Sequence, residues 1–281
     1  MPAVLLSAAA VLVGCTSGSP HSVAAPPTPA QPALEISHVH GVGTDPADGS
    51  LLLATHEGLF RVTAEGQAEL ASPVMDLMGF TVAGAEHFLA SGHPGLRVDL
   101  PQPMGLIESI DGGRTWSPVS RQGQSDFHAL TTGAAGVLGY DGALLRSDDG
   151  RDWEQLSIPA EPHSLAASPD TDLVLATTAQ GLLRSADAGS TWSAVDGAPL
   201  LQVVDWADDG MHVAGVDPSG VIWISSDGGA SWSSGADLAS PPQAVAVSSS
   251  ADEDHRITVV TAATVVTSTD GGRTFEVVLE Q

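Results

Sequence analysis

The chain has 281 residues, 42% of them hydrophobic, which is enough to bury a sizeable core in one large or two ordinary domains. It has 34 acidic residues but only nine basic ones, all arginine, and the formal net charge is −25. Such a chain repels phosphate backbones and anionic membrane surfaces, so nucleic acid is excluded as an expected partner.

Residues 1–15 are predicted to be a signal peptide. The run VLLSAAAVLVGC, residues 4–15, has the length of a secretory hydrophobic region and ends at small residues. It is too short to cross a membrane as a helix. The ending LVGC resembles the bacterial lipobox, which implies cleavage before Cys15 and lipidation of that cysteine. An ordinary secretion signal with an incidental cysteine is the alternative.

Residues 16–33 are predicted to be a tether. The stretch TSGSPHSVAAPPTPAQPA is rich in Pro, Ser and Ala, and it cannot bury enough apolar surface to fold. Cys15 is the only cysteine, so disulfides cannot stabilise the rest of the chain. We therefore expect an extracytoplasmic protein that contacts the cell membrane only through a lipid anchor.

A short motif repeats along residues 34–281. Its copies are SIDGGRTW at 109–116, SADAGSTW at 185–192, SSDGGASW at 225–232 and STDGGRTF at 268–275, with the shortened copy SDDGRDW at 147–153. The terminal aromatic residues are separated by 37, 39, 40 and 43 residues, and they are Trp116, Trp153, Trp192, Trp232 and Phe275. This spacing predicts the four-stranded blades of a β-propeller.

The motif itself is predicted to be a turn that clips each blade. Its Asp can accept hydrogen bonds from backbone N–H groups, its Gly supplies a positive φ, and its aromatic ring packs beside the blade. The acidic positions are Asp111, Asp149, Asp187, Asp227 and Asp270. Because the copy around Asp149 lacks one residue, its turn is expected to differ.

These residues resemble the Asp-box or BNR repeat, S-x-D-x-G-x-T-W. That repeat occurs in sialidase-type propellers, sortilin-like receptors and photosystem II assembly-factor-like proteins, some of which are labelled glycosyl hydrolases. The resemblance covers about residues 34–281. It implies a propeller whose boxes lie away from the active face, so the boxes are structural and do not indicate an activity.

An all-β propeller with six blades is the predicted fold, with seven blades as the alternative. The 31 Gly and 19 Pro favour short strands and turns over long helices. The blades are expected to begin near residues 36, 76, 126, 161, 201 and 243. We expect the ring to close by pairing of the terminal strand FEVVLEQ with the N-terminal LEISHV region.

Exo-sialidase activity is not expected, although the resemblance to sialidase-type propellers suggests it. Sialidases use a tyrosine nucleophile and an arginine triad that clamps the substrate carboxylate. The single tyrosine, Tyr140, lies in a strand-like segment, and five of the nine arginines lie in or beside the boxes. Another glycoside hydrolase mechanism, based on paired carboxylates, stays open.

Six histidines form the main candidate site. They are His38, His40, His56, His93, His128 and His163. Residues two apart in a strand face one side, and propeller blades begin with their innermost strand, so several imidazoles should converge near the central channel. With Met75 and Met78, and with carboxylates such as Glu57 or Asp126, they would suit Cu or Zn. Packing or hydrogen bonding is the alternative role of each histidine.

The segment HPGLRVDLPQPMGLIES, residues 93–109, replaces a hairpin turn with a long loop. Long loops on rigid scaffolds often carry function, so His93, Arg97 and Asp99 are expected over the channel mouth, with a drifted insertion as the alternative. The predicted function is binding of a metal, small ligand, glycan or envelope protein. The alternative is a glycoside hydrolase of sialidase-like architecture.

Overall fold

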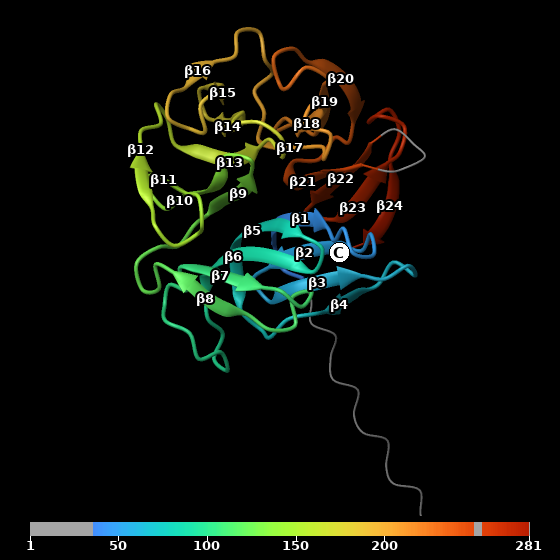
Figure 1. Ribbon diagram of the computed structural model, residues 1–281. Coiled ribbons are helices and arrows are strands. Elements are labelled where there is room, and N and C mark those ends of the chain that lie inside the picture. Colours follow the sequence, from blue (N-terminus) through green and yellow to red (C-terminus); the bar gives the residue numbers. More distant parts are fainter. Residues whose placement is uncertain (1–35, 250–254, 281) are drawn as a thin grey trace, which may run out of the picture. The chain divides into compact units, whose positions relative to one another are not determined.

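Six four-stranded antiparallel blades form a ring in the computed structural model, which describes residues 36–249 and 255–280 (Figure 1). The six-bladed propeller prediction is confirmed. The described residues contain no helix, and hence none long and apolar enough to cross a membrane. The predicted lipidation site Cys15 and the predicted tether, residues 16–33, lie outside the described residues.

Every blade has the same course, from an innermost strand outwards. The first three blades are β1 (Val39–Thr44), β2 (Leu51–Thr55), β3 (Gly58–Val62), β4 (Ala68–Leu70); β5 (Asp76–Gly84), β6 (His87–His93), β7 (Leu106–Ser109), β8 (Ser117–Ser120); and β9 (Ala129–Gly133), β10 (Gly136–Tyr140), β11 (Leu144–Ser147), β12 (Glu154–Leu156). The last three are β13 (Pro162–Ala167), β14 (Val174–Thr178), β15 (Gly181–Ser185), β16 (Ser193–Ala194); β17 (Val203–Trp206), β18 (Val213–Val216), β19 (Val221–Ser225), β20 (Ser233–Asp237); and β21 (Pro242–Ser248), β22 (Arg256–Thr261), β23 (Thr264–Ser268), β24 (Glu276–Glu280). The blades begin close to the predicted residues.

The core lies between neighbouring blades. The second strands are nearly continuous apolar runs, such as LLLAT in β2 and VLATT in β14, and they are buried on both sides. A strand that alternated apolar and polar residues would place polar groups against one neighbouring blade. Each blade is therefore stabilised by burial against two others, at about 25 cal/mol per Å² of apolar surface.

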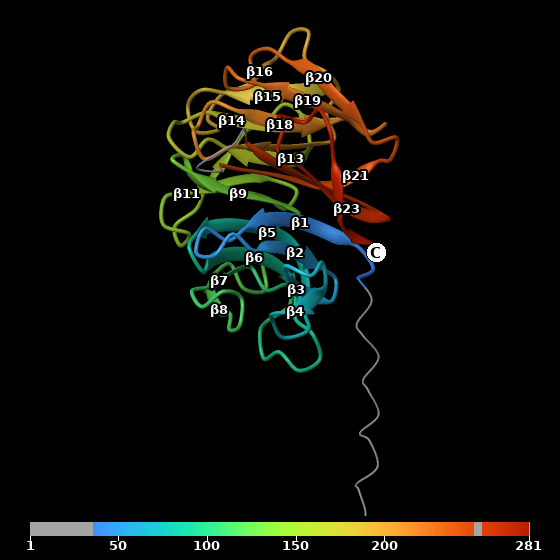
Figure 2. The same ribbon diagram turned by 90° about the vertical axis from the view of Figure 1, so that its right-hand side faces the viewer.

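The ring closes differently from the prediction. β24 pairs with β23 inside its own blade, so all four strands of the sixth blade come from the C-terminal segment. β1–β4 also form a complete blade, so no strand from the N-terminal segment completes the sixth blade. The ring instead closes by packing: β1 lies beside β5 and β21, as Figures 1 and 2 show, and Val39 shares an apolar cluster with Ala244 and Val260.

The repeated motif forms the turn between the third and fourth strands. In the fifth blade, Asp227 Oδ1 accepts hydrogen bonds from the Ser231 N–H (2.8 Å) and the Ser225 hydroxyl (2.8 Å), and Oδ2 accepts one from the Ser231 hydroxyl (2.6 Å). The Trp232 indole donates to the carbonyl of Gly229 (3.1 Å). The bonds from the Thr backbone and hydroxyl to the carboxylate recur at Asp111, Asp187 and Asp270.

Glycine is required in this turn. Gly229 has φ of 78°, and a Cβ there would lie 2.8 Å from Leu175 in the preceding blade. The motif therefore seats each turn against its neighbour. The shortened copy keeps part of this pattern: Asp149 Oδ1 accepts from the N–H groups of Arg151 (2.8 Å) and Asp152 (3.0 Å), but Trp153 donates to Ser120 of the second blade.

The direction of the strands divides the turns between two faces of the ring. Inner strands all begin on one face, which also holds the turns between second and third strands; we call it the entry face. The opposite face, which we call the box face, holds the turns between first and second strands and the repeated motifs. The predicted separation of the motifs from the histidine-rich face follows from this alternation.

Loss of a motif carboxylate is expected to destabilise the fold in a pH-dependent way. Hydrogen bonds from Ser231 lower the pKa of Asp227 to about 2, below the value of about 3.9 in unfolded chains. Its stabilising contribution is therefore present above about pH 4 and is lost as the pH falls through 2. In thermal melts at pH 7, Asp227→Ala should lower the Tm by a few degrees, and the difference from wild type should vanish near pH 2.

The matched control is Asp196→Ala, which removes an exposed carboxylate in the fourth blade that makes no hydrogen bond to the described residues. Equal melting temperatures for Asp227→Ala, Asp196→Ala and wild type at pH 7 would contradict the clip role of the motif.

Candidate functional site

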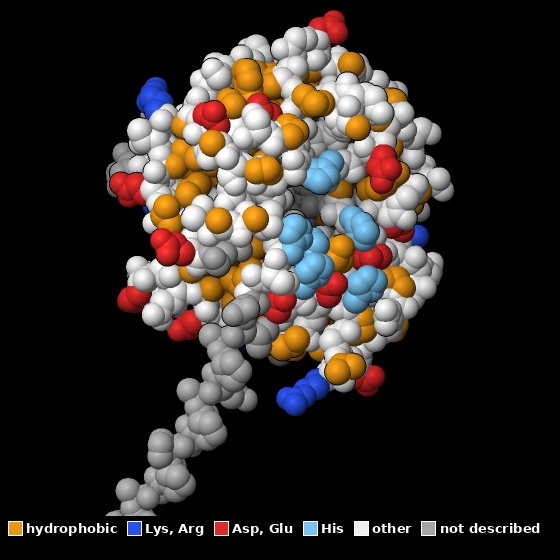
Figure 3. Space-filling model, turned by 180° about the vertical axis from the view of Figure 1, so that it is seen from behind, with side chains coloured by type: hydrophobic (Ala, Val, Ile, Leu, Met, Phe, Trp, Pro, Cys, Tyr) orange, Lys and Arg blue, Asp and Glu red, His pale blue; other side chains and the backbone are white. Residues whose placement is uncertain are grey.

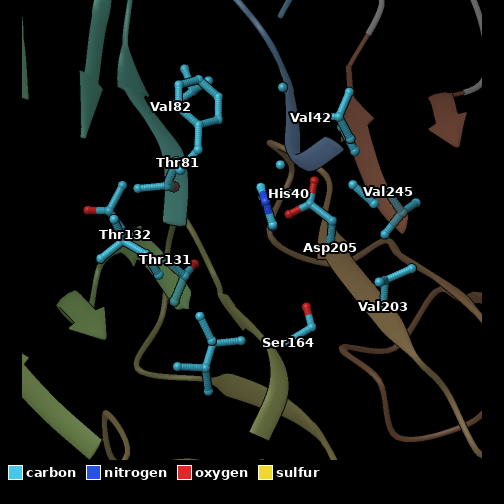
Figure 4. A pocket seen from close by; sticks show the side chains of 18 of the residues that line it. His40, Val42, Thr81, Val82, Thr131, Thr132, Ser164, Val203, Asp205 and Val245 are labelled. Atoms are coloured by element: carbon cyan, nitrogen blue, oxygen red, sulfur yellow. The ribbon is translucent and has the colours of Figure 1, made fainter. Parts of the chain in front are cut away.

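The six inner strands line a central channel of about 1410 Å³. Figure 4 shows side chains from every blade pointing into it. One from each inner strand, in blade order, is His40, Thr81, Thr131, Ser164, Asp205 and Val245. The wall thus combines hydroxyl and apolar side chains with the imidazole of His40 and the carboxyl of Asp205.

Histidines gather at the entry-face mouth, where Figure 3 shows them around the opening with acidic side chains between them. His38, His40, His128 and His163 line the channel itself. They do so because each lies at or just before the start of an inner strand. His56, in the β2–β3 turn, and His93, the last residue of β6, lie on the same face.

The first cluster joins blades one and two. His40 Nε2 lies 3.3 Å from His56 Nε2 and 3.4 Å from His56 Nδ1, and His56 Nδ1 lies 2.9 Å from Asp76 Oδ1. One ligand atom from each of these three residues lies within 4.8 Å of the others. Tetrahedral zinc with bonds of about 2.1 Å needs ligand atoms about 3.4 Å apart, so small side-chain rotations would suffice.

His38 supports this cluster from the other side. Its ring packs edge-on against His40, with centroids 4.7 Å apart, and its Nδ1 lies 2.9 Å from Gln243 Nε2 of the sixth blade. Desolvation, followed by repulsion from His38 and His56, lowers the pKa of His40 to about 4. His40 is therefore neutral at pH 7 and keeps a nitrogen lone pair that can bind a metal.

The second cluster joins blades two and three around one carboxylate. Asp126 Oδ2 lies 3.1 Å from His93 Nε2 and 3.0 Å from His128 Nε2. Gly79 makes this approach possible, because a Cβ there would lie 2.3 Å from the carbonyl oxygen of Phe127. Within the part of the chain that the structure describes, His93 Nδ1 and Asp126 Oδ1 are buried without a hydrogen-bond partner, which marks a place for a further polar group.

The two clusters meet in blade two, since the β5–β6 ladder pairs Asp76 with His93. The structure thus brings together five of the six predicted histidines. His163 lines the channel from the fourth blade, where burial lowers its pKa, but it makes no ring contact with the other five.

Some predicted residues lie elsewhere. Met78 lines the channel, but Met75 is fully buried in the core of the first two blades. Arg97 and Asp99 are exposed and are not among the described residues that line the channel, so their place over its mouth stays a prediction. Val98 and Leu100, between and beside them, pack against that same core and hold the loop there.

Asp76 was not predicted from the sequence, and the predicted ligand Glu57 is not part of the cluster. Glu57 accepts a hydrogen bond from the Ser37 hydroxyl (2.6 Å), whereas Asp76 faces His56. The available signal was positional: Asp76 is the first residue of an inner strand, as His128 immediately precedes one.

Acidic side chains as well as histidines line the channel. Among the described residues that line it, none is arginine, which leaves no candidate there for a carboxylate-clamping triad. Asp205 lines the channel from β17, and its Oδ2 accepts a hydrogen bond from the Val247 N–H (2.8 Å). Desolvation raises the pKa of Asp205, and hydrogen bonds from the backbone N–H groups of Val247 and Trp206 oppose this rise.

The chain is similar to known proteins over part of its sequence and in its fold. No protein-family model matches the sequence. A stretch of 84 residues is 37% identical to vacuolar protein sorting/targeting protein 10 of Aspergillus flavus and of Aspergillus oryzae, and it covers 27% of this chain but only 6% of those proteins. The chain therefore corresponds to a small part of these relatives.

Two solved structures are similar in fold. A chain of the nidogen/laminin complex superposes with a TM-score of 0.63 and 12% identity, over 80% of this chain and 91% of that one. The GH74 xyloglucanase from Xanthomonas campestris gives a TM-score of 0.57 and 19% identity, over 86% of this chain and 45% of that one. At these identities the similarity establishes a shared fold and leaves function to the site.

The protonation of His40 can be measured directly. In chelator-treated protein, ¹H–¹⁵N spectra of the imidazoles should give a titration midpoint for His40 near pH 4. Because the unfolded chain takes up this proton near pH 6.5, the folded state should lose stability as the pH falls from about 6.5 to 4. In His40→Gln this loss should be smaller. A His40 midpoint above pH 6 would contradict the desolvated environment.

Proposed function

We propose that the protein binds a divalent transition metal, Zn²⁺ or Cu²⁺, at the entry face of its channel through His40, His56 and Asp76. The observation that carries the proposal is the approach of His40 Nε2 to His56 at 3.3 Å beside a carboxylate at 2.9 Å. Two imidazoles and one carboxylate are a common ligand set for these metals.

The surroundings favour a cation at this place. Asp126 and Glu161 line the same mouth, no arginine does so among the described residues, and the chain carries a net charge of −25. Two imidazoles held at van der Waals distance repel when both are protonated, so the arrangement disfavours extra protons and suits a shared metal.

A three-residue set leaves a coordination position open, which points to a binding role. His56 is 42% exposed, so a metal here would be reachable from solvent and from the channel. A small ligand, a glycan or an exposed group of an envelope protein could occupy that position. We infer a binding module in which the metal contributes one contact and the channel wall supplies the others.

Metal titration tests the proposal. In calorimetric titrations of tag-free, chelator-treated protein with Zn²⁺ and then Cu²⁺, His56→Ala and His40→Ala should each abolish one equivalent or weaken it at least about tenfold. His87→Ala is the matched control, because His87 pairs with Glu108 at 2.8 Å and belongs to neither entry-face cluster. The proposal is refuted if both site variants bind as many equivalents of metal, and as tightly, as wild-type protein does.

Glycoside hydrolysis is the second candidate, and one observation favours it. Asp205 is a channel carboxyl with a raised pKa, which is the property of a general acid in such enzymes. If this candidate is correct, chromogenic glycosides should be hydrolysed by wild type and by His56→Ala, but at least about 100-fold more slowly by Asp205→Asn. If neither metal-free nor metal-loaded wild type hydrolyses glycosides, the hydrolase candidate is refuted and the binding module remains.

We also propose that the propeller is exported and held at the cell membrane by lipid on Cys15, an expectation drawn from LVGC and the following Pro-rich stretch. In a bacterial host, the full-length chain should fractionate with membranes and incorporate labelled fatty acid, and Cys15→Ser should do neither. Label retained in Cys15→Ser would contradict this assignment.

A further inference from the structure

A second group of ligand-type side chains lies on the box face, between blades five and six. Asp209 Oδ2 lies 2.5 Å from His212 Nδ1 and 3.1 Å from His255 Nε2. The two imidazole rings are 4.3 Å apart between centroids. One ligand atom from each residue lies within 4.8 Å of the others.

The local fold holds the carboxylate in place before any ligand binds. Asp209 lies in the β17–β18 turn, and its Oδ1 accepts hydrogen bonds from the N–H groups of Met211 and His212, both at 2.9 Å. The turn is closed by the Ala207 N–H, which donates to the carbonyl of His212 at 2.8 Å. With Oδ1 occupied by the backbone, Oδ2 is left to face the two imidazoles.

His255 comes from the other blade, immediately before β22. It meets the turn of blade five because β17 packs beside β21, and because the Ser249 N–H donates to Asp208 Oδ2 (3.2 Å) across the blade boundary. His255 Nδ1 is buried and has no hydrogen-bond partner among residues 36–249 and 255–280. Its ring can therefore turn to offer either nitrogen without breaking a second hydrogen bond.

We propose that Asp209, His212 and His255 form a second metal site that binds a divalent first-row transition cation such as Zn²⁺ and links blade five to blade six. Two imidazole nitrogens and one carboxylate oxygen match such a cation. The side chains are 34%, 40% and 25% exposed, respectively, which gives the ion a route of entry and leaves water to complete its coordination.

The charge around the group supports a cation. No arginine forms an ion pair with Asp209 in the described part of the chain, and Asp208 adds a second carboxylate beside it. A divalent ion would replace the hydrogen-bonding protons between Asp209 and the two rings. This site does not depend on the entry-face site, because the turns between first and second strands lie at the opposite end of the channel from the beginnings of the inner strands.

The experiment uses the His40→Ala protein, in which the entry-face cluster of His40, His56 and Asp76 is disabled. Calorimetric titration of this tag-free, chelator-treated variant with Zn²⁺ should show one remaining equivalent. Adding His212→Ala or His255→Ala should remove that equivalent or weaken it at least about tenfold. Adding His87→Ala should leave it unchanged, because the His87 and Glu108 pair lies in another blade.

A second measurement separates ligation from a structural effect of the variants. Cu²⁺ bound to the His40→Ala protein should give an electron paramagnetic resonance spectrum with nitrogen hyperfine coupling, and this coupling should decrease in His40→Ala/His255→Ala. Zn²⁺ should also raise the Tm of His40→Ala but not of the double variants, since a metal bound only to the folded state stabilises it.

Two results would overturn the second site. They are a His40→Ala protein that binds no Zn²⁺, and double variants whose titration matches that of His40→Ala. Either result would leave the entry-face proposal untouched, because that proposal concerns the equivalent lost when His40 or His56 is replaced in wild-type protein.

Discussion

Packing of blade six against blade one is the constraint on which the rest of the structure depends. The middle strands of every blade are apolar on both sides, so each blade needs two neighbours, and an open arc would expose an apolar face at each end. The contact that completes the ring combines the apolar cluster around Val39 and Val260 with a polar one, since the Val39 N–H donates to Gln243 Oε1 (3.2 Å). The same Gln243 side chain contacts His38, so closure of the ring and orientation of the entry-face histidines share one residue.

A closed ring also concentrates side chains that are far apart in the sequence. The starts of the six inner strands surround one opening, and polar residues of neighbouring blades come close there, as His56 Nδ1 and Asp76 Oδ1 do at 2.9 Å. This crowding explains why His40 is desolvated and surrounded by other imidazoles, and why Asp126 is shared by His93 and His128. Because His40 is neutral at pH 7, it can lie beside His38 and His56 without charge repulsion.

The two ends of the channel differ in how their polar groups are satisfied. On the box face the motif carboxylates are saturated by backbone N–H and hydroxyl donors, as Asp227 illustrates, and they have little capacity left for a ligand. Asp209 lies on that face too, but the backbone occupies only its Oδ1. On the entry face, Asp76 and Asp126 pair with imidazoles instead. The chemistry of each acidic residue therefore follows from how many backbone donors its turn supplies.

The sequence by itself determined the blade, because the blade is a local unit. The spacing of Trp116, Trp153, Trp192, Trp232 and Phe275 reports strand and turn lengths within about 40 residues, and this predicted the number of blades, their starts and the role of the motif aspartates. The placement of His40, His128 and His163 at inner strands followed from the same count. Only the tertiary structure decided which strands complete the last blade and which side chains meet. Pairs such as His56 with Asp76, or Asp209 with His255, join neighbouring blades, and their distances are set by blade packing, which leaves no periodic signal in the sequence.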